Sequence, residues 1–295
     1  MNEHQCEHIV FAGNGMSAVA CVEELLKNGQ VFDITIFGDE PHANYDRALL
    51  PSLLAGECDI GSITLNDIEW YQEHGIRTRL GIRVEEIDRL GRAVRSSDGD
   101  WTCYDKLILA TGSSPVIPPV DGLDKDGVFV FGTLDDTRRI IDAAYEGSRA
   151  IVIGDWLATE AGRGLRKRGC NVTVAEIEAV LGDGRVEAVR FKNGEEAAAD
   201  LVVIAMDFRP NIQLALEAGL EVEANRGILV NDQLETSDPH IFAVGGCTDC
   251  LPPLSEQAKV LAANLSRHPL STTAPSRRSL SQPANLPHSP AALPI

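Results

Sequence analysis

The sequence predicts a Rossmann-like α/β fold built from two strand–turn–helix–strand units, of which the second is shortened. Three observations support this prediction. Residues 8–37 pass from an apolar strand through a glycine turn and an amphipathic helix to a second apolar strand. Residues 150–174 repeat the same order of elements, with the helix expected over residues 160–168. A later apolar strand at 241–244 runs directly into two glycines, and this segment, with a helix expected over residues 254–265, should return the chain to the first unit.

The composition indicates a folded, acidic protein with room for two domains. The chain has 295 residues, of which 44% are hydrophobic, and its formal net charge is −18. This charge disfavours binding to nucleic acid or to an anionic membrane surface, because both need a positive field. No apolar run approaches the roughly 20 residues of a membrane-spanning helix, and the polar start does not resemble a signal peptide. We therefore expect a cytoplasmic protein without nucleic-acid or membrane partners, whose scattered cysteines are reduced.

The first glycine turn has the residue types that a dinucleotide pyrophosphate requires. Gly13 permits a sharp turn after the strand, and Gly15 lets a ligand approach the backbone closely. Ala18 is small enough for the following helix to pack on the strand. The first residues of that helix, Met16 and Ser17 among them, present free N–H groups and a partial positive charge to phosphate. Because the turn has the required strand–turn–helix–strand context, we interpret it as a nucleotide-binding turn.

Two acidic residues follow the second strand of this unit. Asp39 and Glu40 both lie where a carboxylate can accept hydrogen bonds from an adenosine ribose. We favour Glu40 for this role. Either residue alone is also compatible with an acidic surface turn.

The segment between the two units is predicted to contain one helix and several short strands. Residues 62–75 have helical spacing, and residues 82–87, 93–96 and 101–104 are predicted to form short antiparallel strands. A buried strand at 107–110 follows, and the prolines beyond it mark a crossover toward the second unit.

Several longer segments carry a family resemblance. They read GNGMSA, ITIFGDEPHANYDRALL, ITLNDIEWYQEHGI, YDKLILATGSSPVIPPVDG and TSDPHIFAVGGC. In this order they resemble the FAD-dependent pyridine nucleotide-disulfide oxidoreductases, and within these the N-terminal flavin part of the large subunit of NAD(P)H nitrite reductase. The resemblance covers residues ~8–265. It implies an FAD/NAD(P)-binding fold with two dinucleotide domains.

The resemblance implies FAD as the cofactor and assigns residues to it. The first turn would hold the FAD pyrophosphate, and Glu40 would bind the adenosine ribose. Arg47 would lie along the cofactor with its planar cation near phosphate or flavin, and a surface arginine is the less favoured alternative. Val84, otherwise a plain strand valine, would offer its backbone to the adenine. Further contacts would come from the crossover at Ala110, Thr111 and Gly112, and from Gly245 and Gly246 beside the ribityl chain.

The second glycine turn departs from the Gly-x-Gly-x-x-Gly pattern that the family uses for NAD(P)H. Counted from Gly154, Trp156 stands in the place of the second glycine, where its indole would obstruct a pyrophosphate. Asp155 adds negative charge there, and Thr159 replaces the third small residue. Glu176 could still face a ribose, but an exposed acid at a strand end is the simpler interpretation. FAD is therefore the expected cofactor, whereas NAD(P)H binding is doubtful.

The second unit is also short. From Glu176 the chain reaches a Gly182-x-Gly184 turn almost directly, where the family has roughly half a nucleotide domain. The remainder, one strand–helix–strand and a hairpin, is too small for an autonomous domain and would need to pack on the first unit. We predict an FAD-binding domain at 1–118, a reduced NAD(P)-binding-like domain at 119–232, a return segment of the FAD-binding domain at 233–265 and a disordered tail at 266–295. A polyproline II ligand for a partner is the alternative for the tail.

The end of the last strand carries two further departures from the family. Gly246 stands where an acidic residue usually contacts the cofactor, so one polar contact is lost. Cys247 and Cys250 form a C-x-x-C pair, which is either redox-active at a helix N-terminus or, as we favour, two reduced structural thiols. No second C-x-x-C is present, so we expect no metal site.

Three functions remain open from the sequence. The first is an FAD-dependent oxidoreductase or electron-transfer subunit that takes electrons from NAD(P)H or a partner protein and passes them on through FAD. The second is a non-catalytic FAD-binding or interaction module with a degenerate NAD(P)H site. The third is a truncated product without activity. We favour the first because the residues of the first turn still suit the chemistry. The sequence assigns no catalytic residue and no oligomeric state.

Overall fold

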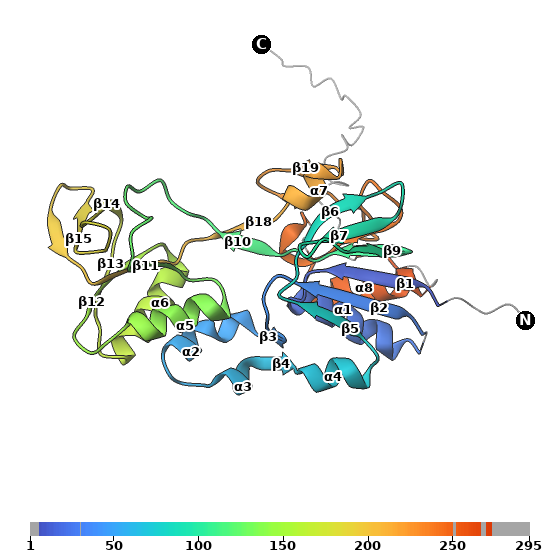
Figure 1. Ribbon diagram of the computed structural model, residues 1–295, viewed down its shortest axis with the longest axis horizontal. Coiled ribbons are helices and arrows are strands. Elements are labelled where there is room, and N and C mark those ends of the chain that lie inside the picture. Colours follow the sequence, from blue (N-terminus) through green and yellow to red (C-terminus); the bar gives the residue numbers. More distant parts are fainter. Residues whose placement is uncertain (1–5, 30, 250–251, 267–269, 273–295) are drawn as a thin grey trace, which may run out of the picture.

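The computed structural model describes residues 6–29, 31–249, 252–266 and 270–272, and Figure 1 shows their arrangement. Two parallel sheets lie toward opposite ends of the molecule and are joined by two short paired strands, β10 (Ser113–Pro115) and β18 (Phe208–Pro210). None of the described helices is long and apolar enough to cross a membrane. Most of the tail that we predicted to be disordered lies outside the described residues.

The first sheet joins early and late strands of the chain, in the order β21-β9-β1-β2-β5. Its central strands are apolar because both faces are covered. Helices α1 (Met16–Lys27) and α8 (Leu254–Leu265) pack against each other and contribute to the same core as these strands. The late strand lies beside β9, so the predicted return of the chain to the first unit is present. The strands are β1 (His8–Ala12), β2 (Asp33–Gly38), β5 (Arg77–Leu80), β9 (Lys106–Leu109) and β21 (Ile241–Ala243).

A three-stranded antiparallel sheet follows β5, as the alternating sequence predicted. Helix α7 (Gln213–Glu217), which follows the last strand of the second sheet along the chain although the sequence placed it in the second domain, packs against the first strand of this antiparallel sheet. Segments more than a hundred residues apart thus lie side by side at the edge of the first unit (Figure 1). The strands are β6 (Val84–Asp88), β7 (Ala93–Ser96) and β8 (Trp101–Cys103), with a hairpin of β19 (Val222–Glu223) and β20 (Gly227–Ile228) nearby.

The helix predicted over residues 62–75 is wrong in its first part. The side chain of Asp67 accepts a hydrogen bond of 2.9 Å from the backbone N–H of Trp70, and this cap starts a separate helix. The residues before it pair with Asn44 and its neighbour as a short strand, so tertiary pairing overrides helical spacing. The elements are β3 (Asn44–Tyr45), η1 (Arg47–Leu49), α2 (Leu50–Leu54), α3 (Ile60–Ile63), β4 (Thr64–Asn66) and α4 (Ile68–Glu73).

The second sheet is larger than the single strand–helix–strand that we predicted. It has four parallel strands in the order β11-β17-β12-β13, because strands from before and after the repeated unit join it. Side chains alternate between its faces: Ala150 and Val152 meet the helices, whereas Ile151 and Ile153 meet a three-stranded antiparallel sheet. The strands are β11 (Val128–Val130), β12 (Arg149–Ile153), β13 (Asn171–Val174) and β17 (Leu201–Ile204), the helices α5 (Leu134–Ala143) and α6 (Trp156–Lys167), and the antiparallel strands β14 (Ile177–Leu181), β15 (Ala188–Phe191) and β16 (Glu196–Ala198).

The core of the second unit is completed by the first unit, as its small size led us to expect. Leu50, Leu54 and Ile63 from the first unit share one buried cluster with Phe131 and Leu165 from the second. Helix α2 contacts both α5 and α6. The two units therefore fold as partners, and neither sheet is covered by its own segment alone.

Candidate cofactor site

The first glycine turn begins with a residue that the protein itself requires to be glycine. Gly13 has φ +127°, and a Cβ at this position would lie 2.1 Å from the carbonyl oxygen of Ala110. Its N–H donates to the carbonyl of Phe37 at 2.8 Å. The turn is thus wedged between the ends of β2 and β9, and no side chain fits at this point.

The second glycine of the turn is not required by packing. Gly15 has φ −77°, and a Cβ built on it would meet no atom within 4 Å. It is the N-cap of α1, and no side chain among the described residues caps this helix. The N–H groups of Met16, Ser17 and Ala18 therefore stand at a helix N-terminus that is open to a ligand, a favourable place for an anion.

The residue between these glycines is held on both sides. Tyr71 donates its hydroxyl to Oδ1 of Asn14 at 2.8 Å, and Nδ2 of Asn14 donates to the carbonyl of His42 at 3.3 Å. Burial raises the pKa of Tyr71 to about 12, so its hydroxyl stays protonated and remains a donor. The turn is consequently rigid before any ligand binds.

The last strand brings its two glycines to the same place. A Cβ on Gly245 would lie 2.0 Å from the Oγ of Ser17, and one on Gly246 would lie 3.2 Å from the Oγ of Ser113. Buried Gln257 fixes this end by accepting the N–H of Gly245 at 2.9 Å. The carboxyl ends of β1, β9 and β21 thus meet at the predicted turn, the edge where parallel sheets bind ligands.

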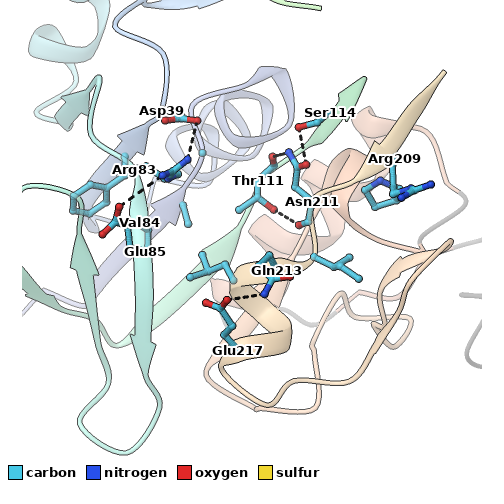
Figure 2. Close-up of a pocket in the computed structure, with 16 residues that line it drawn as sticks. Asp39, Arg83, Val84, Glu85, Thr111, Ser114, Arg209, Asn211, Gln213 and Glu217 are labelled. Atoms are coloured by element: carbon cyan, nitrogen blue, oxygen red, sulfur yellow. Dashed lines mark hydrogen bonds and ion pairs between the residues drawn. The ribbon is translucent and has the colours of Figure 1, made fainter. Parts of the chain in front are cut away.

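A pocket of about 740 Å³ opens at this edge, between β6 on one side and α7 with β18 on the other (Figure 2). Its size is within the usual range for small-molecule and cofactor sites. Figure 2 shows Asp39, Arg83 and Glu85 on one wall and Asn211, Gln213 and Glu217 on the other. The lining residues are Ala12, Gly13, Phe37, Asp39, Arg83, Val84, Glu85, Thr111, Ser114, Arg209, Pro210, Asn211, Ile212, Gln213, Leu214 and Glu217.

Asn211 ties the second wall of the pocket to the crossover. Its Nδ2 donates to the carbonyl of Thr111 at 2.8 Å, and its own carbonyl accepts the hydroxyl of Thr111 at 2.8 Å. Its N–H donates to the carbonyl of Gly112 at 3.0 Å, and its Oδ1 accepts the hydroxyl of Ser114 at 2.8 Å. These bonds hold together the two chain crossings, β10 (Ser113–Pro115) and β18 (Phe208–Pro210), at the pocket.

Two of the predicted residues point elsewhere. Glu40 accepts the hydroxyl of Tyr45 at 2.7 Å and pairs with the guanidinium of Arg47. Arg47 also donates to the carbonyl of Gly132 in the second unit, at 3.3 Å. Neither side chain lines the pocket, whereas Asp39 does. The Glu40–Arg47 pair therefore links the two units.

The other predicted residues gather around the pocket and the turn. Gly13, Val84 and Thr111 line the pocket, and Gly15 to Ala18, Ala110, Gly112, Gly245 and Gly246 lie at the adjoining strand ends. The second wall, at 209–217, was not predicted from the sequence. The signal available was the Arg-Pro-Asn stretch directly after a buried strand, where a chain leaving one sheet must cross to the other.

The second turn repeats the first one only in part. Gly154 has φ +137°, and a Cβ there would lie 2.1 Å from the carbonyl oxygen of Ala205. This is the same distance as that between a Cβ on Gly13 and the carbonyl oxygen of Ala110. The helix, however, begins at Trp156, two positions after this glycine, and not at Glu160 as predicted. In the first unit the helix begins at Met16, three positions after Gly13. The second turn is therefore one residue shorter.

This difference corrects the assignment of positions that we made by counting from Gly154. Asp155 is the N-cap of α6 and so takes the place of Gly15. Ala158, fully buried as the third helical residue, takes the place of Ala18, so the packing of α6 is not loosened at Thr159, which is exposed. Trp156 is the first helical residue, with 74% of its surface exposed.

The cysteine pair is described only at its first member, because Cys250 lies outside the described residues. Cys247 is fully buried, and its thiol lies 3.3 Å from the carbonyl oxygen of Val244. Burial raises the pKa of this thiol, so the nucleophilic thiolate is disfavoured. Within the described residues, no group of three or more His, Cys, Asp or Glu side chains is arranged to hold a metal ion.

The fold and the turn define a Rossmann-like reductase fold with two nucleotide-type units in one chain. The chain belongs to the pyridine nucleotide-disulphide oxidoreductase family, which it matches over residues 7–182 and 175–264. This confirms the resemblance and the fold class predicted from the sequence, and it supports FAD as the cofactor.

The curated relatives that the chain matches include proteins of nitrate and nitrite reduction. The chain is 39% identical over 302 residues to the assimilatory nitrate reductase electron transfer subunit of Bacillus subtilis, with 88% of this chain and 39% of that protein covered. It is 40% identical to the nitrite reductase [NAD(P)H] of the same organism, covering 88% and 37%. The nitrite reductase (NADH) large subunit of Escherichia coli is 32% identical over 278 residues, covering 81% and 33%. The chain thus spans less than two fifths of the length of these relatives.

The matches also locate the shortening. The family match comes in two parts that overlap at residues 175–182. Since 88% of the chain is about 260 residues, an aligned length of 302 leaves roughly 40 positions without a counterpart here. The overlap begins directly after β13 and includes β14, in the region where the sequence predicted the shortening.

Solved structures show the same fold. The covalent putidaredoxin reductase–putidaredoxin complex matches with a TM-score of 0.81 at 25% identity, covering 89% of this chain and 76% of the matched chain. The ferredoxin reductase for the CYP199A2 system from Rhodopseudomonas palustris matches with a TM-score of 0.82 at 24% identity, covering 92% and 78%.

Proposed function

We propose that this chain is an FAD-dependent oxidoreductase module of the nitrite reductase large-subunit type, which passes electrons from a donor to a partner protein through FAD. The observation that carries the proposal is the open space at Gly15 above an uncapped helix N-terminus. A glycine that packing does not require, placed where a pyrophosphate would sit, is explained by close approach of a ligand. Relatives named as an electron transfer subunit and as nitrite reductases support the redox role.

The residues present fit FAD along the whole edge of the first sheet. The turn at Gly13 to Ala18 would hold the pyrophosphate, and Val84 and the other pocket residues would take the adenosine. We infer that Asp39 accepts the ribose hydroxyls in place of Glu40, because Asp39 lines the pocket, where its contact with Arg83 is a long one of 3.9 Å, whereas Glu40 is held by Tyr45 and Arg47. Gly112 has open space around it beside the remainder of the cofactor, and Gly245 and Gly246 bring the last strand against Ser17 and Ser113 at the same edge.

The chain's own groups would position the cofactor. Bound FAD supplies the capacity to accept a hydride and to pass electrons on. Asn211 and Tyr71 hold the two sides of the groove through neutral hydrogen bonds, and the helix N-terminus adds partial positive charge at the phosphates. The protein contribution is thus orientation and electrostatics.

A non-catalytic FAD-binding or interaction module is the second candidate, and the altered second turn favours it. To separate the two, FAD-loaded protein is reduced photochemically without oxygen and mixed with ferricyanide as an artificial acceptor. We expect reoxidation of the flavin in seconds and its recovery over repeated cycles. Flavin that stays reduced in the presence of acceptor would favour the structural role, and protein that holds no flavin would exclude both.

A further inference from the structure

The second turn keeps the features that the fold requires and changes those that face a ligand. Gly154 is wedged against the end of β17 in the same way as Gly13 against β9, and Ala158 packs α6 as Ala18 packs α1. Both residues are therefore explained by packing within the protein. The positions that serve a dinucleotide in the first unit are an open glycine N-cap and the backbone around it.

In the second unit that N-cap is Asp155, and the turn before it lacks one residue. The side chain of Asp155 is exposed and makes no capping hydrogen bond to its own helix. A carboxylate at the start of α6 occupies the region of partial positive charge that a phosphate would use, and it repels the phosphate as well. The bulky Trp156 comes next and projects from the same end of the helix.

The edge of the second sheet is altered independently of the turn. About 40 positions of the relatives have no counterpart here, and the two parts of the family match meet at residues 175–182, beyond the end of β13. Here β13 is the edge of its sheet, and Asn171, Thr173 and Val174 are exposed. Within the described residues, no strand therefore extends the second sheet past β13.

We propose that the second turn excludes the pyrophosphate of NAD(P)H, and that Asp155 at the shortened turn is the residue that decides this. The proposal rests on the proposed function, because it concerns which donor reduces the same flavin. The second unit then acts mainly by packing, since α5 and α6 complete the core around α2. The flavin must then be reduced by a donor that does not bind as a dinucleotide at the N-terminus of α6.

The test compares binding and reduction in the FAD-loaded protein. Wild type is titrated with NADH and with NADPH by calorimetry, and bleaching of the flavin is followed without oxygen, with dithionite as the positive control. Three variants are compared: Trp156→Gly, Asp155→Asn, and Asp155→Gly combined with one glycine inserted after Gly154. The last restores the length of the first turn and its open N-cap. Flavin content and thermal melting show whether each variant folds.

We expect wild type to show no saturable binding of either nucleotide up to millimolar concentration, while dithionite bleaches the flavin. The lengthened variant should bind NADH or NADPH at least ten-fold more tightly than wild type. Asp155→Asn should show part of this increase in affinity, and Trp156→Gly alone should show none. Saturable binding or bleaching by nicotinamide in wild type would overturn the proposal. A folded lengthened variant that gains nothing would overturn the role of Asp155. Protein without flavin would instead contradict the proposed function.

Discussion

At the scale of single residues, the two glycines of the first turn are present for different reasons. Gly13 is fixed by the protein, because its Cβ would overlap the carbonyl oxygen of Ala110 and its φ is positive. Gly15 adopts an ordinary φ and has open space around it, so packing does not account for it. We propose that the same motif contains one residue required by the fold and one required by the cofactor.

This difference gives a prediction with a built-in control. Gly15→Ala should raise the Kd for FAD at least ten-fold while the apoprotein loses no more than about 1 kcal/mol of stability, the scale of a changed N-cap. Gly13→Ala should lower the free energy of unfolding by ~2 kcal/mol or more, because a strained φ and a backbone overlap are combined. Flavin fluorescence titration and urea unfolding measure the two effects. Equal FAD affinity of Gly15→Ala and wild type would count against the assigned site.

The predicted roles of Glu40 and Arg47 stay predictions, and in the structure these two side chains pair with each other. The sequence favoured Glu40 as the ribose ligand and Arg47 along the cofactor, but in the structure they pair and join the two units. Their pairing depends on the path of the chain between β2 and α2, which spacing alone does not determine. Asp39, the neighbour that we ranked second, is the one that lines the pocket.

At the scale of elements, the contact between α2 and α6 holds the second unit to the first. Gly164 on α6 lies so close to α2 that a Cβ there would stand 3.0 Å from Cγ of Leu54 and 3.2 Å from the backbone N of Ala55. Arg168, at the end of the same helix, donates to the carbonyl of Leu54. Neighbouring Arg163 pairs with Glu57 at 2.9 Å.

We therefore expect Gly164→Val to destabilise the protein, although removing a glycine from a helix normally helps. The added side chain must push α6 away from α2, and such overpacking costs about 1–3 kcal/mol. The matched control is Thr159→Val, an equally β-branched residue at an exposed position of the same helix. Thermal melting should show a lower midpoint for Gly164→Val only; equal midpoints for both variants would mean that this contact does not hold the units together.

Elements with their own local signal could be predicted from the sequence, and those made by distant pairing could not. The first unit, the antiparallel strands at 84–103 and α8 follow from periodicity and glycine turns. The short strand at 64–66 was predicted as helix because its partner lies twenty residues earlier. The start of α6 was misplaced because a turn shortened by one residue keeps the same glycine and the same following strand. The second pocket wall needs a contact between Thr111 and Asn211, which are a hundred residues apart.

At the scale of the whole molecule, the two units share the same strand–turn–helix arrangement but differ in the residues that would contact a ligand. Both keep the wedge glycine and the small helical residue, so both keep their fold. The first keeps an open glycine N-cap, and a pocket of about 740 Å³ adjoins its turn, whereas the second has Asp155 at its N-cap. The second also lacks roughly 40 positions of its relatives and completes its core with Leu50, Leu54 and Ile63 from the first. A chain with two nucleotide folds is therefore expected to hold one dinucleotide.

The stoichiometry of FAD binding tests this claim most directly. Apoprotein is titrated with FAD, and the bound fraction is measured by the change in flavin absorbance and by release of flavin on denaturation. We expect saturation at one FAD per chain in wild type and a clear loss of affinity in Gly15→Ala. The absence of bound flavin, or binding that Gly15→Ala leaves unchanged, would contradict the assignment of FAD to the turn from Gly13 to Ala18.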